Sequence, residues 1–136
     1  MRWTRGPYVL SDDKRRLNLT LIGQWLDQTY WAKDQPMSVL RRAVKHSLCL
    51  GLYRGRQQLG FARAVTDYAT FTWICDVIID PAHRGQGLGK WLVDCLVHHP
   101  KLQTRSQTLG TRDAHRLYTR FGFRSHEVLR RRPRPG

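Results

Sequence analysis

The sequence contains no apolar run that approaches the roughly 20 residues of a membrane-spanning helix. The first seven residues include basic side chains, but the apolar stretch of a secretory signal does not follow them. We therefore expect neither a membrane span nor a leader peptide. A length of 136 residues predicts one domain built around one hydrophobic core.

Cysteine is also scarce. The three cysteines, Cys49, Cys75 and Cys95, are an odd number, and each lies within an apolar segment. This pattern predicts buried, reduced thiols and a cytoplasmic protein. His98 and His99 follow Cys95 closely, but no second pair of ligands has the spacing of a zinc site, so we expect no bound metal.

Acidic residues are few: the chain has 10 Asp and Glu against 24 Lys and Arg, which gives a formal net charge of +14. Such a charge attracts polyanions. The basic residues are scattered, except in the tail at 129–136, where prolines predict an extended and flexible segment. Because no helix-turn-helix, zinc-finger or RNP pattern accompanies the charge, we interpret it as a solvated basic surface rather than a specific nucleic-acid site.

The most informative segment is 76–92, in which an apolar run leads into a glycine-rich turn and then into a helical pattern. The apolar residues of that pattern are Leu88, Trp91, Leu92, Cys95 and Leu96. The first N–H groups of a helix lack internal partners and carry partial positive charge. Gly85, Gly87 and Gly89 allow an anion to approach the backbone closely. The segment therefore predicts a site for a phosphorylated ligand.

This turn differs from the common nucleotide motifs. It lacks the Gly-Lys-Ser/Thr of a Walker loop, and its third glycine follows the second too closely for a dinucleotide fingerprint. Arg84-Gly-Gln-Gly-Leu-Gly89 instead resembles the Arg/Gln-x-x-Gly-x-Gly/Ala motif of the GNAT superfamily of N-acetyltransferases. In that superfamily the turn binds the pyrophosphate of acetyl-CoA.

Residues 109–123 carry a second resemblance to the same superfamily. They are similar to its signature Asn-x-x-Ala-x-x-x-Tyr-x-x-x-Gly-Phe, with Tyr118 at the tyrosine and Thr111 in place of the asparagine. The resemblance implies that Tyr118 is the general acid toward the departing CoA thiolate. The alternative is a core aromatic residue whose hydroxyl reaches solvent. We expect Gly122 to end the helix that carries Tyr118.

The periodicity along the chain predicts the order β-α-α-β-β-β-α-β-α-β. The expected elements are a strand at 8–11, a helix from Asn18 to about Tyr30, a helix after Pro36, strands at 47–53, 58–66 and 70–79, the helix after the glycine turn, a strand at 102–109, the Tyr118 helix and a final strand near 127–131. The resemblance implies an α/β (α+β) fold of the GNAT type over residues 1–136. Its sheet is mixed and mostly antiparallel, with a splayed strand pair, and about four helices flank it.

The resemblance also implies how acetyl-CoA binds. The cofactor would enter the wedge between the strands that end at Ile79 and Leu109. The backbone of Val77, Ile78 and Ile79 would pair with its pantetheine arm, and Thr111 stands where many members contact that arm through asparagine. The residues implied to hold the pyrophosphate are Arg84, Gly85, Gln86, Gly87, Leu88, Gly89 and Lys90.

The reaction implied is direct acetyl transfer to an amine, without a covalent acyl-enzyme. Ser106 stands where some relatives have a glutamate base, so the candidate bases are Asp76, Asp67 or a chain of water molecules. The candidate acceptor residues are Tyr30, Trp31, Asp67 and Tyr68. Aromatic faces and an acid would suit a small cationic amine.

Several alternatives stay open at this stage. The acceptor could be a protein N-terminus, a lysine side chain, a polyamine or an antibiotic. The competing function is a CoA-binding regulatory module, or a basic nucleic-acid-associated module on the same scaffold, without turnover. We expect a monomer or a homodimer whose ligands are acetyl-CoA and an amine.

Overall fold

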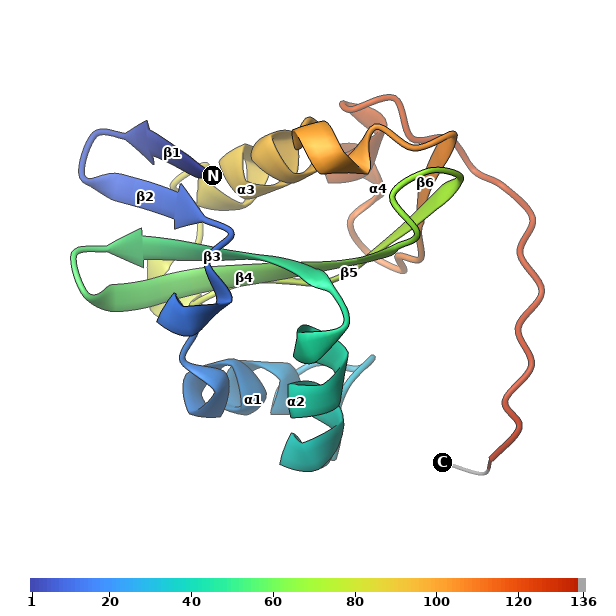
Figure 1. Ribbon diagram of the computed structural model, residues 1–136, viewed down its shortest axis with the longest axis horizontal. Helices are drawn as coiled ribbons and strands as arrows, with labels where there is room; N and C mark the ends of the chain where they lie inside the picture. Colours follow the sequence, from blue (N-terminus) through green and yellow to red (C-terminus); the bar gives the residue numbers. More distant parts are fainter. Residues whose placement is uncertain (135–136) are drawn as a thin grey trace.

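The structure is a computed structural model that describes residues 1–134, and it contains a six-stranded sheet with helices on both faces (Figure 1). The strands are β1 (Arg2–Arg5), β2 (Tyr8–Ser11), β3 (Leu48–Arg54), β4 (Gln57–Thr66), β5 (Phe71–Ile79) and β6 (Ser106–Leu109). The α-helices are α1 (Leu19–Asp27), α2 (Met37–Lys45), α3 (Leu88–Val97) and α4 (His115–Thr119). Short 3-10 turns lie at Lys14–Arg16, Pro81–His83 and Pro100–Leu102. Within residues 1–134, none of the helices has the length and apolar character that a membrane span needs.

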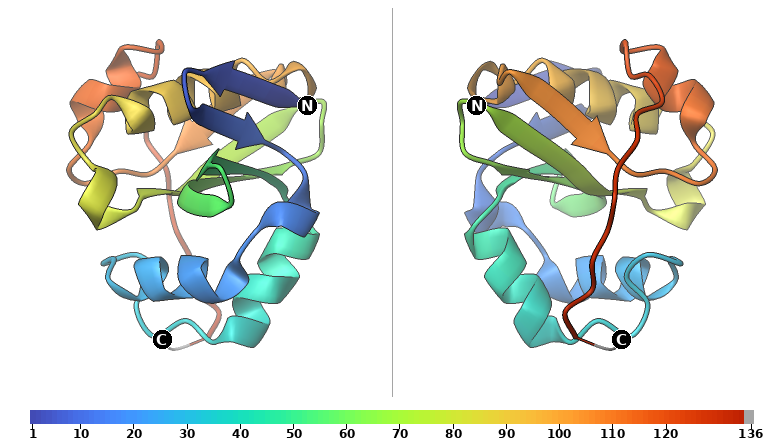
Figure 2. Two further views of the ribbon diagram at one scale, coloured as in Figure 1. Left: turned by 90° about the vertical axis from the view of Figure 1, so that its left-hand side faces the viewer. Right: turned by 90° about the vertical axis from the view of Figure 1, so that its right-hand side faces the viewer.

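The strands lie across the sheet in chain order. Neighbours from β1 to β5 are antiparallel, whereas β6 is parallel to β5. The mixed, mostly antiparallel sheet expected from the sequence is therefore confirmed. Helices α3 and α4 lie on one side of the sheet, and α1 and α2 lie on the other (Figures 1 and 2).

Two hydrophobic clusters fill the two sides of the sheet. Leu48, Leu50 and Leu52 of β3 pack in the cluster that contains the buried side chains of α3, and the intervening Cys49 packs in the cluster of α1 and α2. This alternation follows from the two-residue period of a strand. The apolar run of β3 is therefore buried on both faces, which is why it reads as nearly continuous in the sequence.

A bulge interrupts β5 at Asp76. Ile74 packs in the α3 cluster and Ile78 in the α1–α2 cluster, although residues four apart in a regular strand face the same way. The pairing of β5 with β4 shifts register between Phe61 and Arg63, and Asp76 has a φ of 53°. An extra residue at this point reverses which side chains face which layer. The sequence pattern did not predict this bulge.

The β5–β6 pair separates halfway along β5. The last residues paired between these two strands are Ile74 and Leu109, and β5 continues to Ile79 with only β4 as its partner. This confirms the expected splayed strand pair. The strand expected at 102–109 begins only at Ser106, because residues 100–102 form a 3-10 turn that buries Leu102.

Two expectations for the chain ends were wrong. The amino-terminal residues add a strand, β1, that pairs with β2 in a hairpin. The final strand expected near 127–131 is absent from the described chain, because Val128 and Leu129 are exposed and no partner strand buries them. The segment instead runs along the side of the molecule from α4 toward α1 (Figures 1 and 2). Of the tail expected at 129–136, residues 135–136 lie outside the described residues.

Helix α1 begins at the predicted cap, since Asn18 Oδ1 accepts a hydrogen bond from Leu21 N at 3.0 Å. Replacing Asn18 with alanine leaves that N–H group without its partner, so we expect a loss of about 1 kcal/mol in the free energy of unfolding. Urea denaturation measures this loss. Asn18→Asp keeps an oxygen acceptor and should stay close to the parent, and an alanine variant as stable as the parent would show that the cap contributes nothing.

Candidate functional site

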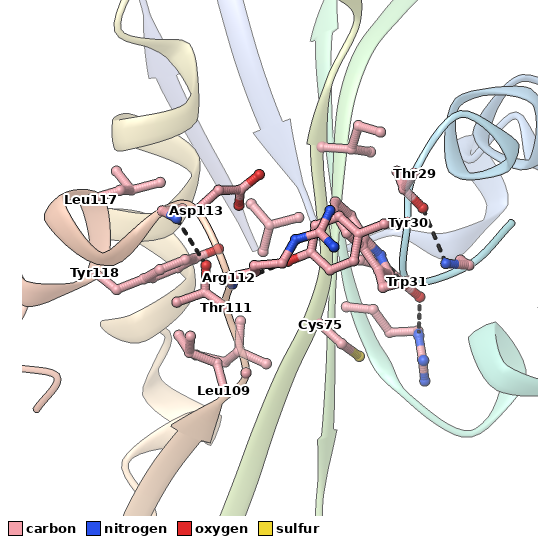
Figure 3. Close-up of a pocket in the computed structure, with 18 of the residues that line it drawn as sticks. Thr29, Tyr30, Trp31, Cys75, Leu109, Thr111, Arg112, Asp113, Leu117 and Tyr118 are labelled. Atoms are coloured by element: carbon pink, nitrogen blue, oxygen red, sulfur yellow. Dashed lines mark hydrogen bonds and ion pairs between the residues drawn. The ribbon is translucent and has the colours of Figure 1, made fainter. Parts of the chain in front are cut away.

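The wedge between β5 and β6 opens into a cleft of about 1430 Å³. Its walls come from the second half of β5, the glycine turn before α3, the β6–α4 loop with α4 itself, and the α1–α2 loop (Figure 3). Residues 130–134 also line it. The cleft-lining residues that the sequence predicted are Tyr30, Trp31, Asp76, Val77, Ile78, Ile79, Arg84, Gly85, Gly87, Leu88, Gly89, Thr111 and Tyr118. The fold thus brings most of the predicted site together from four separate segments.

The glycine turn presents bare backbone to this cleft. Gly85 and Gly87 have φ values of 83° and 75°, in the left-handed region that favours glycine. Apart from the glycine itself and its two chain neighbours, no heavy atom in residues 1–134 lies within 4 Å of the position that a Cβ would take at either glycine. Gly87 is the N-cap of α3, and no side chain caps the helix. The first N–H groups of α3 and the open turn therefore form a cradle that fits a phosphate group.

Two predicted members of the turn do not line the cleft. The side chain of Gln86 accepts a hydrogen bond from the Tyr8 hydroxyl at 3.2 Å, which ties the turn to β2. Lys90 lies in the first turn of α3 and is likewise outside the lining. Arg84 is anchored differently, because its Nε donates to the carbonyl of Ile79 at 3.2 Å.

Tyr118 lies in α4 and faces the cleft beside Leu117 (Figure 3). Burial, with smaller electrostatic contributions from Tyr30 and Asp113, raises the pKa of Tyr118 to about 12. Its ring packs edge-on against Phe123, with the centroids 5.9 Å apart. The phenol is therefore neutral at physiological pH and keeps a proton to donate.

Thr111 precedes α4 and lines the same wall of the cleft. Its Oγ1 accepts a hydrogen bond from Ala114 N at 3.0 Å. The side chain thus shapes the loop that leads into α4. A threonine hydroxyl is shorter than an asparagine amide, and in this structure its oxygen is bonded within its own loop.

The Asp76 carboxylate is held by two donors. Oδ2 accepts from Arg63 Nε at 2.8 Å, and Oδ1 accepts from Trp31 Nε1 at 3.2 Å. Arg63 also donates from Nη1 to Ser47 Oγ at 3.1 Å. The carboxylate is 8% exposed and the arginine 16%. Because both oxygens are bonded to donors, the geometry favours a positioning role for Asp76 over the general-base role that the sequence suggested.

Asp67 and Tyr68 lie away from the cleft, in the turn between β4 and β5. Hydrogen bonds to the Asp67 carboxylate from the Thr70 hydroxyl and then from the N–H groups of Ala69, Thr70 and Phe71 hold its pKa well below its usual range. Tyr68 lines a separate shallow depression next to Pro100. The structure therefore does not bring these two residues to Tyr30 and Trp31, since Asp67 serves to close its own turn.

A contact between two loops closes part of the cleft. Arg112 N, in the β6–α4 loop, donates to the Tyr30 hydroxyl at 3.1 Å, and the Arg112 guanidinium lies 3.7 Å from the centre of the Tyr30 ring (Figure 3). The Tyr30 ring meets Trp31 edge-on, with the centroids 5.0 Å apart. We call this Tyr30–Arg112 contact the loop bridge.

Sequence reasoning missed Arg63 and Arg112. Arg112 resembles the many solvated arginines of this basic chain, and nothing in its local sequence distinguishes it. Arg63 did carry a signal, because it is the single charged residue in β4 and lies within its apolar stretch at 59–65. A charged residue in a buried strand requires a partner, so the sequence could have singled out Arg63, although its pairing with Asp76 depends on the register between β4 and β5.

The cysteines do not have the properties of nucleophiles. Cys75 lines the cleft, but burial raises the pKa of its thiol to about 12. Burial likewise raises the pKa values of Cys49 and Cys95, each to about 11. Thiols that stay protonated at neutral pH are poor nucleophiles. Within residues 1–134, no three His, Cys, Asp or Glu side chains gather in a group that could hold a metal ion.

Comparison with known proteins identifies a family. The model of the family described as "Acetyltransferase (GNAT) domain" matches residues 45–125. A protein of Gibberella zeae that is named as an acetyltransferase is 36% identical in an alignment that covers 69% of this chain. The match spans 64% of the length of the fungal protein.

Solved structures have the same architecture. A protein of Xanthomonas campestris pv. campestris described as belonging to the GNAT family has a TM-score of 0.87 and 42% identity, with 93% of this chain and 94% of that chain covered. An acetyltransferase of Clostridium acetobutylicum, described with acetyl-CoA, has a TM-score of 0.68 and 14% identity over 92% of this chain and 94% of that chain. At the lower identity the likeness concerns the fold alone.

Proposed function

The chain belongs to the GNAT family of N-acetyltransferases, and we propose that it transfers the acetyl group of acetyl-CoA directly to a primary amine. The observation that carries the proposal is the single cleft in which an open glycine cradle and a protonated tyrosine, Tyr118, lie together. The cradle suits a pyrophosphate, and the tyrosine suits the protonation of a leaving thiolate.

Acetyl-CoA would supply the activated acetyl group as a thioester. Its pyrophosphate would lie against the turn from Arg84 to Lys90. Beyond Ile74, β5 no longer pairs with β6, so the backbone of Val77–Ile79 has hydrogen-bonding groups available toward the wedge. A strand N–H in this stretch would polarise the thioester carbonyl and stabilise the oxyanion that forms.

The protons move in opposite directions in this proposal. The amine loses a proton to water, because the carboxylates of Asp76 and Asp67 are already occupied by hydrogen-bond donors. The nitrogen attacks the thioester carbon, the carbon–sulfur bond breaks, and Tyr118 donates its proton to the sulfur. The raised thiol pKa of Cys75 supports direct transfer without an acyl-enzyme.

Two measurements test this function. Isothermal titration with acetyl-CoA measures binding, and a thiol-release assay with a panel of amines measures turnover. We expect binding together with amine-dependent release of CoA. Binding without release from any amine would instead support a regulatory role without turnover, which the family assignment does not favour, and absence of binding would contradict the cofactor assignment.

Asp76→Asn tests the positioning role. Asparagine keeps an oxygen for Trp31 but loses the ion pair with Arg63. The wall of the cleft that Trp31 and the α1–α2 loop form should therefore be held less firmly. We expect the KM for the amine to rise about two- to tenfold, the effect of one ordinary hydrogen bond. The acidic limb of the pH–rate profile should keep its position, because that limb reflects the deprotonation of the acceptor amine itself. Loss of that limb in Asp76→Asn would show that Asp76 is the general base after all.

A further inference from the structure

The charge of the cleft is strongly one-sided. Seven arginines line it, whereas only two carboxylates do so. The arginines are Arg63, Arg84, Arg112, Arg130, Arg131, Arg132 and Arg134, and the acids are Asp76 and Asp113. Asp76 is already paired with Arg63, so Asp113 is the only lining carboxylate in residues 1–134 without an ion pair. Such a lining repels an ammonium group and attracts an anion.

Arg112 is positioned as an anion receptor. Its guanidinium is stacked on the Tyr30 ring and its backbone N–H is bonded to the Tyr30 hydroxyl, so the side chain is held at the cleft. Within residues 1–134, no carboxylate or carbonyl accepts a hydrogen bond from the Arg112 guanidinium. Stacking uses the face of the guanidinium and leaves its N–H edges free for a carboxylate or a phosphate.

The C-terminal segment adds charge to the same place. Residues 130–134 line the cleft, and in the described chain no hydrogen bond or ion pair joins residues 124–134 to a partner. Figure 2 shows this segment running past the sheet toward helices α1 and α2. Its arginines are therefore unpaired charges that line the same cleft as the loop bridge. The phosphate cradle belongs to the turn before α3, whereas the loop bridge joins the α1–α2 loop to the β6–α4 loop.

We propose that the acceptor is an amine that also carries an anionic group, a carboxylate or a phosphate, which binds the Arg112 guanidinium. This inference rests on the proposed acetyl transfer and names its substrate class. It replaces the cationic amine that the aromatic residues suggested from the sequence, because the Tyr30 face that would receive a cation is occupied by Arg112. The acceptor nitrogen would then reach toward Tyr118, while the anion stays at the loop bridge.

Matched pairs of amines test the proposal on the full chain. Tyrosine with tyramine and ornithine with putrescine differ by a carboxylate, and glucosamine 6-phosphate with glucosamine differs by a phosphate. In at least one pair, we expect the member that carries the carboxylate or phosphate to be acetylated with a kcat/KM about tenfold or more above that of its partner. This is the effect of a hydrogen bond to a charged group. The pairs also distinguish a carboxylate from a phosphate as the recognised group.

Arg112→Gln shows whether this preference comes from the loop bridge. In this variant the ratio of kcat/KM values within a pair should be about tenfold smaller, and Arg112→Lys should keep part of the preference. Arg56→Gln removes the same charge from the β3–β4 turn outside the cleft and should keep the full preference. Circular dichroism verifies that all three variants are folded.

The outcomes separate the two proposals. A preference that falls in Arg112→Gln but not in Arg56→Gln supports the anionic acceptor. Equal or faster acetylation of the members that lack the carboxylate or phosphate overturns this inference and leaves the acetyltransferase function intact. If none of the amines releases CoA while titration shows acetyl-CoA bound, the proposed acceptor chemistry fails, and the anionic acceptor fails with it.

Discussion

Replacing Tyr118 with phenylalanine is expected to lower kcat by about 100- to 10,000-fold, the range typical of general acid–base groups. The ring remains, so its edge contact with Phe123 and the fold should survive. The KM for acetyl-CoA should change little, because the proton is needed only as the carbon–sulfur bond breaks. The rates are compared at saturating acetyl-CoA with an amine that the parent protein acetylates.

Tyr53→Phe is the matched control. The Tyr53 hydroxyl is also buried, and burial raises its pKa to about 12, but the residue lies outside the cleft. Removal of this hydroxyl should leave kcat unchanged. A Tyr118→Phe variant as fast as the Tyr53→Phe variant would show that Tyr118 is a packing residue and that water protonates the thiolate.

The pH dependence of the parent protein follows from the same group. Burial disfavours the phenolate and raises the pKa of Tyr118 to about 12, so the acid form is fully present at neutral and moderately alkaline pH. As pH rises, this form is lost only near the raised pKa. We therefore expect kcat to show no alkaline limb up to about pH 11, one unit below that value. A limb near pH 9 would indicate that a different group donates the proton.

Those parts of the site that depend on local chain geometry could be predicted from the sequence. The glycine turn and the start of α3 are adjacent in the chain, so Gly85, Gly87 and Leu88 identified the cradle directly. Tyr118 was found through the resemblance of residues 109–123 to the second GNAT signature. The Asn18 cap and most strand positions followed from short-range periodicity in the same way.

Features that depend on partners distant in the sequence could not be predicted. The bulge at Asp76 arises from a change of register against β4. The positions of apolar residues in the sequence do not specify how two strands pair, so they could not predict that change. Asp67 looked like an acceptor-site acid, but it bonds to the backbone of its own turn. The loop bridge joins residues 82 positions apart, Tyr30 and Arg112. The strand expected near 127–131 failed because Val128 and Leu129 have no partner strand to bury them.

Gly87→Val is expected to weaken acetyl-CoA binding by about tenfold or more, since the cradle requires bare backbone at this position. Gly87 has a φ of 75°, a conformation that a β-branched residue adopts only under strain, and it caps α3 with no side chain. A valine would either place its methyl groups where the proposed pyrophosphate would lie or move the first N–H groups of α3 away from that position. Isothermal titration of the folded variant measures the affinity.

Gly55→Val separates loss of the cradle from backbone strain. Gly55 has a φ of 60° in the β3–β4 turn, and there too no heavy atom of the described chain lies within 4 Å of a Cβ position, apart from Gly55 and its two chain neighbours. Both valine variants should therefore lose stability to a similar extent, because the same left-handed conformation is strained in both. Only Gly87→Val should lose affinity for acetyl-CoA, because only Gly87 lines the cleft. If both variants bind acetyl-CoA as tightly as the parent, the turn from Arg84 to Gly89 does not hold the pyrophosphate.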